Sequence, residues 1–166
     1  ELNADGTVTI YNCWEDHGQG ADMGTLATAH QALRPLGLSA DQIKLVMNDT
    51  SICPNSGPAG GSRSQVVVGQ SIRVGCEELI KAMTKADGSY RTYDEMVAEN
   101  IPTKIHGKWT APANDCDANG QGKPFCCYMY GVFLSTVAVE VATGKTTVES
   151  MVCVADVGTV VNKLVV

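Results

Sequence analysis

Two glycine-rich turns carry the residues of this sequence whose types and spacing could do chemistry. The first turn, residues 14–20, reads Trp-Glu-Asp-His-Gly-Gln-Gly, and the second turn, residues 58–65, reads Pro-Ala-Gly-Gly-Ser-Arg-Ser-Gln. Each lies just before a helical pattern. Glycine lets a backbone approach a ligand closely, and the first N–H groups of a helix lack internal partners and lie at the positive end of its dipole. The pair therefore predicts one site for an anionic ligand such as a phosphate.

The second turn offers the more complete set of phosphate contacts. The candidates are the glycine pair and the residues at the helix start: Gly60, Gly61, Ser62, Arg63, Ser64 and Gln65. The glycines allow close approach, the serines supply hydroxyls, and the backbone amides would point outward. The alternative is that Ser62 or Ser64 only caps a helix. Glycine spacing alone favours this alternative, because neither a phosphate-loop signature nor a Gly-x-Gly-x-x-Gly pattern is present.

Three segments in a fixed order resemble a known family. They are Glu-Asp-His-Gly-Gln-Gly at 15–20, Pro-Asn-Ser at 54–56 leading into Gly-Gly-Ser-Arg-Ser at 60–64, and Asp-Val-Gly-Thr-Val-Val-Asn at 156–162. In this order the chain resembles the molybdenum-binding part of the molybdenum hydroxylases, the xanthine oxidase and aldehyde oxidoreductase family. The resemblance spans nearly the whole chain and is greatest to the aldehyde oxidoreductases of sulfate-reducing bacteria.

The resemblance implies a cofactor and roles for particular residues. The cofactor would be molybdopterin with molybdenum, in its cytosine dinucleotide form, although the residues alone do not separate mononucleotide from dinucleotide. The first turn would contact it through His17, Gly18 and Gln19, and the second through the six residues named above. Trp14 would wall a substrate channel, with an ordinary core tryptophan as the alternative. No catalytic residue and no metal-ligating side chain is expected in this segment.

Family features that this sequence lacks predict a piece of a larger polypeptide. The catalytic glutamate of the family lies in a Gly-x-Gly-Glu turn, and closely spaced cysteines hold its two iron–sulfur clusters; this sequence has neither. The resemblance therefore places the [2Fe-2S] clusters and the catalytic base in other domains of the same polypeptide, and the full enzyme is expected to be a homodimer. It would oxidise a small aldehyde to a carboxylic acid with an oxygen atom from water, and the segment alone would be inactive.

Composition predicts a single globular domain over residues 1–166. A formal net charge of −6, with no cluster among the twelve basic residues, argues against nucleic acid as a partner. No signal peptide, transit peptide or membrane span is seen, and a cytoplasmic location is expected. None of the seven cysteines forms a Cys-x-x-Cys pair, and Cys126 and Cys127 would face opposite sides of a strand. Reduced and mostly buried thiols are the prediction.

A rival chemistry comes from residues 115–120, which read Asp-Cys-Asp-Ala-Asn-Gly and match the opening of a calcium loop. The match then fails, because the twelfth position is Cys126 instead of a glutamate and Lys123 brings a positive charge. A solvated loop is the favoured interpretation. The alternative function is a non-catalytic module that binds calcium or a partner protein.

The elements that would position these residues can be inferred from periodicity. They are a strand at 7–13, helices at 22–34, 64–84 and 92–99, a strand at 43–48, and a hairpin around the turn 142–145. Met23 and Leu33 belong to the expected apolar stripe of the first helix. Gly69 and Gly75 lower the helix propensity of 64–84, so packing or close approach must explain them. The fold class predicted is α+β, with helices packed on a mainly antiparallel sheet.

Overall fold

The structure, a computed structural model, describes residues 1–160 and 163. The chain forms two compact units, Glu1–Ala111 and Pro112–Val166, and each is described by itself. The prediction of one domain over residues 1–166 stays a prediction. Val161 and Asn162, which belong to the third segment of the family resemblance, lie outside the described residues.

The first unit contains every helix and strand predicted between residues 7 and 99. Its elements are β1 (Val8–Asn12), α1 (Ala21–Ala32), η1 (Arg34–Leu36), η2 (Ala40–Gln42), β2 (Ile43–Met47), η3 (Ser64–Val68), α2 (Gly69–Met83) and α3 (Tyr93–Ala98). The predicted helix 64–84 is thus confirmed, but its first turn, η3, is π-helical. Such π-helical turns occur frequently at functional sites.

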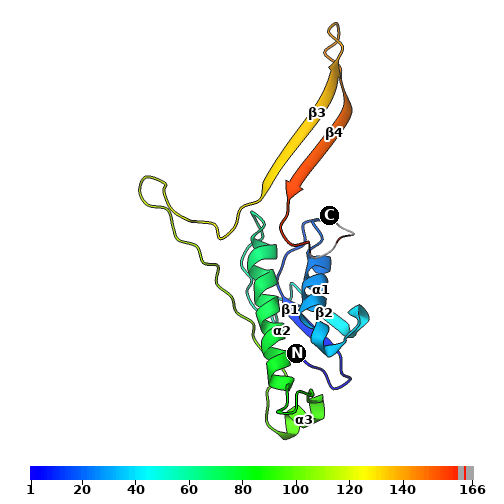
Figure 1. Cartoon of the computed structure of the whole chain (residues 1–166), viewed down its shortest axis with the longest axis vertical. Helices are drawn as coiled ribbons and strands as arrows, with labels where there is room; N and C mark the ends of the chain where they lie inside the picture. Colours follow the sequence, from blue (N-terminus) through cyan, green and yellow to red (C-terminus); the bar gives the residue numbers. More distant parts are fainter. Residues whose placement is uncertain (161–162, 164–166) are drawn as a thin grey trace. The chain divides into compact units, whose positions relative to one another are not determined.

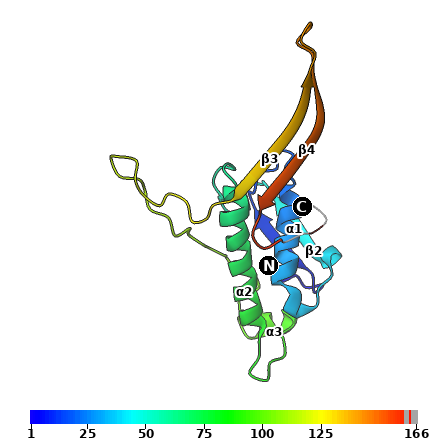
Figure 2. The same ribbon diagram turned by 45° about the horizontal axis from the view of Figure 1, so that its top comes forward.

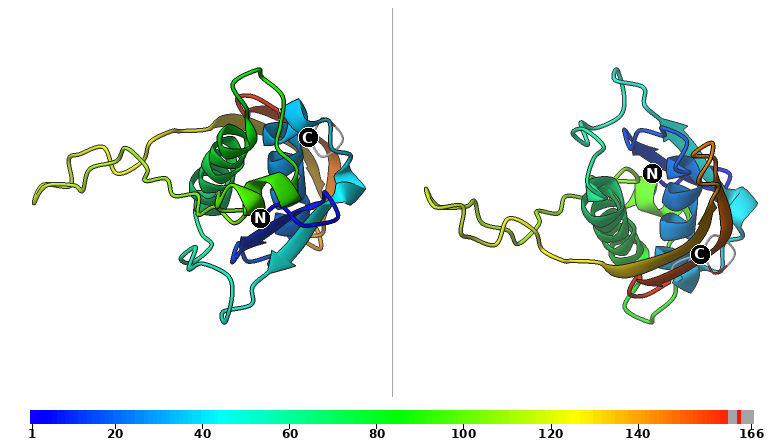
Figure 3. Two further views of the ribbon diagram at one scale, coloured as in Figure 1. Left: turned by 90° about the horizontal axis from the view of Figure 1, so that it is seen from below. Right: turned by 90° about the horizontal axis from the view of Figure 1, so that it is seen from above.

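The strands β1 and β2 pair in parallel, in register from Val8 opposite Ile43 to Asn12 opposite Met47. Parallel strands need a crossover connection, and α1 lies within it. Figure 3 shows the two strands side by side next to α1. The predicted mixture of helices with an antiparallel sheet is confirmed, since β3 and β4 pair antiparallel, and the parallel β1–β2 pair adds to it.

The core of the first unit lies where α1 and α2 pack together beside β1 (Figure 1). The buried residues of α1 are Ala21, Thr25 and Ala29, which repeat every four positions. Met23, in contrast, is 57% exposed, so its predicted place on the buried stripe is wrong. The reason is that small residues bring α1 close to its neighbours, and a stripe of small residues is hard to recognise by hydropathy. Leu33 is fully buried as predicted.

Close backbone approach explains Gly75 of α2, as predicted. The segment 104–109 crosses α2 at Gly75, where Gly107 lies against the helix backbone. A Cβ at Gly107 would come within 2.7 Å of the Gly75 Cα and closer still to the Ser71 carbonyl oxygen. At Gly69, a Cβ would lie 3.5 Å from Nε2 of Gln65. The packing therefore requires glycine at position 75, whereas a Cβ at Gly69 would make only an ordinary van der Waals contact.

The second unit contains one long hairpin, β3 (Tyr130–Val139) and β4 (Thr146–Asp156), drawn in Figure 2. The strands pair antiparallel, with an irregularity between Thr136 and Val137. The predicted hairpin is confirmed. Gly144, with φ of 73°, makes the turn. All described residues from 112 to 159 are exposed within this chain.

The prediction of mostly buried cysteines is wrong. Cys76 is buried in α2, but the four cysteines of the second unit are exposed: Cys116, Cys126, Cys127 and Cys153. The described part of this unit has no second layer that could cover them. Cys126 and Cys127 also precede β3, so the argument about opposite strand faces does not apply. Within the described residues, none of the helices has the length and apolar character needed to cross a bilayer.

Candidate functional site

The first turn leaves β1 and enters α1 through two glycines in the left-handed region. Gly18 has φ of 101° and Gly20 has φ of 82°. The Asp16 carboxylate accepts the N–H of Gly18 at 2.7 Å and the N–H of Gly20 at 3.2 Å. Backbone hydrogen bonds, that of Gly18 first, hold the pKa of Asp16 below its ordinary value. An anionic side chain of the protein itself therefore satisfies the amides at the start of α1.

The predicted contact residues of the first turn lie on its exposed outer side. His17, Gly18 and Gln19 are all exposed. The side-chain amide of Gln19 closes the turn on itself, because its oxygen accepts the His17 N–H at 2.5 Å and its nitrogen donates to the Glu15 carbonyl at 2.7 Å. The side-chain oxygen and nitrogen of Gln19 thus fix the shape of the turn in this chain.

In the second turn, the guanidinium of Arg63 points inward. It donates to the Ser56 carbonyl at 2.6 Å and to the Pro58 carbonyl at 3.3 Å. A Cβ at Gly57 would come within 2.8 Å of this guanidinium, so the side chain fills the interior of the loop. The side chain of Arg63 therefore shapes the turn from within.

The outer side of the second turn presents a row of free backbone amides. The N–H groups of Gly60, Gly61 and Ser62 donate to no other described residue. Gly61 has φ of 53° and Ser62 has φ of 58°, both left-handed. Successive N–H groups in such a turn form a concavity suited to an anion. Of the helix-start amides, that of Arg63 is used internally, since it donates to the Gly60 carbonyl at 2.9 Å.

The structure brings the two predicted turns together. The Glu15 carboxylate of the first turn accepts the N–H of Ala59 in the second at 2.6 Å. Close by, the N–H of Cys13 donates to the hydroxyl of Ser56 at 3.0 Å. Glu15 and Ser56 were not predicted as site residues, although both lie in segments that carry the family resemblance.

Trp14 and Gln65 lie against α1 at Gly24. A Cβ at Gly24 would be 3.0 Å from the Trp14 ring and 3.4 Å from Oε1 of Gln65. Trp14 is only 4% exposed and belongs to the core, which favours the core alternative over a channel wall. Its indole Nε1 has no hydrogen-bond partner among the described residues. A buried donor of this kind is uncommon and calls for an acceptor.

Helix capping does not account for the serines of the second turn. Neither η3 nor α2 has a side-chain hydrogen bond at its N-cap. Ser64 is buried at 7% exposure, whereas Ser62 is exposed. The capping alternative is therefore wrong for this structure.

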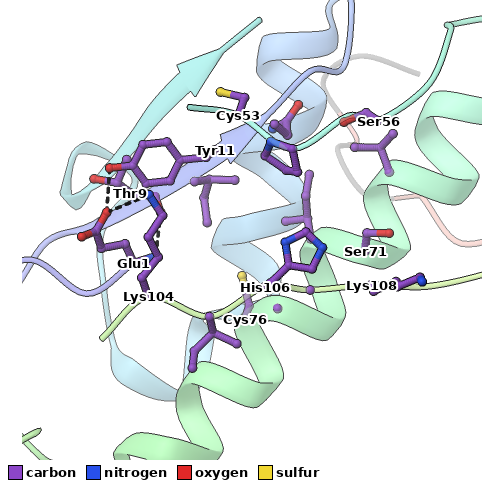
Figure 4. Close-up of a pocket in the computed structure, with 18 of the residues that line it drawn as sticks. Glu1, Thr9, Tyr11, Cys53, Ser56, Ser71, Cys76, Lys104, His106 and Lys108 are labelled. Atoms are coloured by element: carbon purple, nitrogen blue, oxygen red, sulfur yellow. Dashed lines mark hydrogen bonds and ion pairs between the residues drawn. The ribbon is translucent and has the colours of Figure 1, made fainter. Parts of the chain in front are cut away.

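A groove of about 810 Å³ adjoins the second turn, with Arg63 of the turn and Ser56 just before it in the lining. Its other walls come from β1, α2 and the segment 104–109. Figure 4 shows Ser71 and Cys76 of α2 in the lining of the groove, together with His106 of the segment 104–109. Lys104 lies 3.8 Å from the centre of the Tyr11 ring.

The two remaining sequence candidates belong to the second unit. Gly158 donates its N–H to the Asp156 carboxylate at 3.0 Å, so the start of the third segment is a closed turn. In the predicted loop 115–120, the Asp117 carboxylate accepts the N–H groups of Asn119 and Gln121. Among residues 1–160 and 163, no group of three or more His, Cys, Asp or Glu side chains could hold a metal ion.

The sequence and the fold of this chain are similar to those of known proteins. The chain is 57% identical to aldehyde oxidoreductase from Megalodesulfovibrio gigas over 166 residues, covering 99% of this chain and 18% of that protein. It is 28% identical to xanthine dehydrogenase/oxidase from Gallus gallus, covering 95% of this chain and 12% of that protein. The structure of aldehyde oxidoreductase from Desulfovibrio desulfuricans superposes with a TM-score of 0.95 at 68% identity, covering 99% of this chain and 18% of that one.

The chain thus spans about a fifth of the length of the aldehyde oxidoreductases it matches. The family described as "Molybdopterin cofactor-binding domain" matches residues 1–166, which supports cofactor binding over the calcium alternative. The chain belongs to the molybdopterin cofactor-binding domain family.

Proposed function

We propose that the second turn binds the phosphate side of a molybdopterin cofactor and that the first turn lies beside the pterin. The observation that carries this proposal is Gly60. A Cβ there would meet no atom of the described chain within 4 Å, and its φ lies outside the left-handed region. Neither packing nor backbone conformation therefore requires glycine at this position. Close approach of a ligand to the backbone would require it.

The donors of both turns fit an anionic cofactor. The free N–H groups of Gly60, Gly61 and Ser62 suit phosphate oxygens. The buried Nε1 of Trp14, at the start of the first turn, is a donor without a partner in the described chain. His17, Gly18, Gln19 and Ser64 would contribute contacts around this frame. Arg63 and Gln65 would support it, since their side chains already pack within this chain.

The activity proposed for the complete protein is the oxidation of a small aldehyde to a carboxylic acid. When bound, the molybdenum cofactor supplies this chemistry, with an oxygen atom taken from water. Support comes from the aldehyde oxidoreductases that the chain resembles at 57% and 68% identity. We propose the cytosine dinucleotide form of molybdopterin because the sequence motifs resemble those of the aldehyde oxidoreductases of sulfate-reducing bacteria. Other domains of the same polypeptide would supply the [2Fe-2S] clusters and the catalytic base, in a cytoplasmic homodimer.

The test is Gly60→Val in the full-length protein. A branched side chain there reaches open space in this chain but would occupy the volume of a bound phosphate. We expect the dissociation constant of the cofactor to rise at least about tenfold, equivalent to about 1.4 kcal/mol of binding free energy, and molybdenum and phosphorus per protein to fall with it. The melting temperature of the cofactor-free protein should not change. Wild-type molybdenum content would show that the second turn is not the cofactor site.

A further inference from the structure

One peptide group in the second turn is held at both of its polar atoms. The Ala59 N–H of the Pro58–Ala59 peptide donates to the Glu15 carboxylate at 2.6 Å. The Pro58 carbonyl of the same peptide accepts from the Arg63 guanidinium at 3.3 Å. An acidic side chain and a basic side chain therefore fix the plane of this peptide from opposite ends.

The plane of this peptide matters because the glycine pair comes directly after it in the chain. Glycine restricts its own backbone dihedrals least of all residues, so Gly60 and Gly61 add little constraint of their own. The direction of the N–H groups of Gly60, Gly61 and Ser62 therefore depends on how the chain enters the glycine pair. The Glu15 contact sets that entry, and it reaches the turn from a residue 44 positions away in the sequence.

The two neighbouring carboxylates of the first turn have different partners. Asp16 accepts backbone amides of its own turn, at Gly18 and Gly20. Glu15 instead reaches across to Ala59. His17 approaches Glu15, at 3.8 Å between the imidazole nitrogen and the carboxylate, on an exposed side of the turn. Glu15 is thus the residue through which the first turn contacts the second turn by a side-chain hydrogen bond.

We propose that Glu15 is a positioning residue of the cofactor site. Its carboxylate holds the Pro58–Ala59 peptide and thereby aims the free amides of the glycine pair at the phosphate. It acts through the hydrogen bond to Ala59 and makes no contact with the cofactor itself. This inference rests on the proposed function of the second turn.

The experiment separates the reach of the side chain from its charge. Glu15→Gln keeps the reach and an acceptor oxygen, Glu15→Asp keeps the charge but shortens the side chain, and Glu15→Ala removes both. Each variant of the full-length protein is loaded with cofactor and dialysed, and molybdenum per protein is followed with time. We expect the Ala and Asp variants to lose molybdenum at least about tenfold faster than wild type, and the Gln variant to lose it within about threefold of the wild-type rate.

The matched control is Glu77→Ala, which removes an exposed carboxylate paired with Arg73 on α2. It should retain molybdenum like wild type. Wild-type retention by both Glu15→Ala and Glu15→Asp would overturn the proposal, and so would a Gln variant that loses molybdenum as fast as Ala. Gly60→Val distinguishes the two levels of failure. If Gly60→Val loses molybdenum and the Glu15 variants do not, positioning by Glu15 is wrong; if none loses it, the second turn is not the site.

Discussion

Glycines serve opposite purposes in two regions of the first unit. Where the segment 104–109 crosses α2, Gly75 and Gly107 lie so close that a Cβ on either would press on the backbone of the other. In the second turn, Gly60 and Gly61 face no atom of the described chain within 4 Å. The first region excludes side chains because protein occupies the space, whereas in the second turn the space is open and is, in our proposal, filled by the cofactor.

The two regions differ in what requires their glycines. Gly61 has φ of 53°, so its backbone conformation alone would account for a glycine there. At Gly60 neither packing nor a positive φ accounts for the glycine. A glycine that neither packing nor φ accounts for is evidence of a ligand that approaches the backbone. At Gly107, in contrast, packing against α2 accounts for the glycine, so we expect it to matter for stability and not for ligand binding.

The largest effect is expected from Gly107→Ala. The added Cβ would lie within 2.7 Å of the Gly75 Cα, and rigid backbone on both sides cannot turn away as a side chain could. Overpacking typically costs about 1–3 kcal/mol, and we expect at least about 3 kcal/mol here. Thermal or urea unfolding of the full-length protein measures this loss. If the stability of Gly107→Ala were unchanged, the two glycine regions would not differ as described.

The second effect is that of Gly61→Val, with Gly37→Val as its matched control. Both glycines have positive φ, 53° and 69°, and a Cβ at either meets nothing within 4 Å. The backbone strain should therefore be similar, about 1–3 kcal/mol in each. Gly37 comes directly after η1, away from either turn in the sequence, so only Gly61→Val should also lower the molybdenum content. Equal molybdenum content in the two variants would remove the second turn from the cofactor site.

Much of the fold could be predicted because local patterns decide it. Periodicity and turn residues mark the two strands of the first unit, the two long helices and the hairpin. The parallel pairing of β1 with β2 was not predicted. Met23 was misplaced because the buried face of α1 consists of Ala21, Thr25 and Ala29, and a hydropathy pattern gives such small residues little weight. The exposure of the cysteines in the second unit was missed because it depends on which layers the chain itself provides.

The two turns of the site could be predicted from the sequence, but the hydrogen bonds within and between them could not. Glycines and serines at helix starts mark where a phosphate can approach. The inward guanidinium of Arg63 and the hydrogen bond from Ala59 to Glu15 depend on contacts between distant residues, which spacing in the sequence does not record. Trp14 was left open between core and channel, and its burial depends on the packing of α1 through Gly24.

The smallest expected effect is that of removing the charge of Asp16, which tests whether the glycines of the first turn serve its conformation or a ligand. Gly18 and Gly20 also face open space, but their N–H groups are held by Asp16, so they should serve the conformation of the turn. The pKa of Asp16 is lowered from 3.8 by these hydrogen bonds. A lowered folded-state pKa stabilises the protein above the unfolded-state pKa, and the stabilisation is lost as the pH falls through the folded-state pKa.

The test is Asp16→Asn, which keeps an acceptor oxygen without the charge. The melting temperature of the cofactor-free wild type should therefore exceed that of the Asn variant at neutral pH, and the gap should close as the pH falls below about 4. Comparing the two proteins at each pH cancels the other acidic groups. A gap that is constant over this range would mean that the charge of Asp16 does not help to hold the turn.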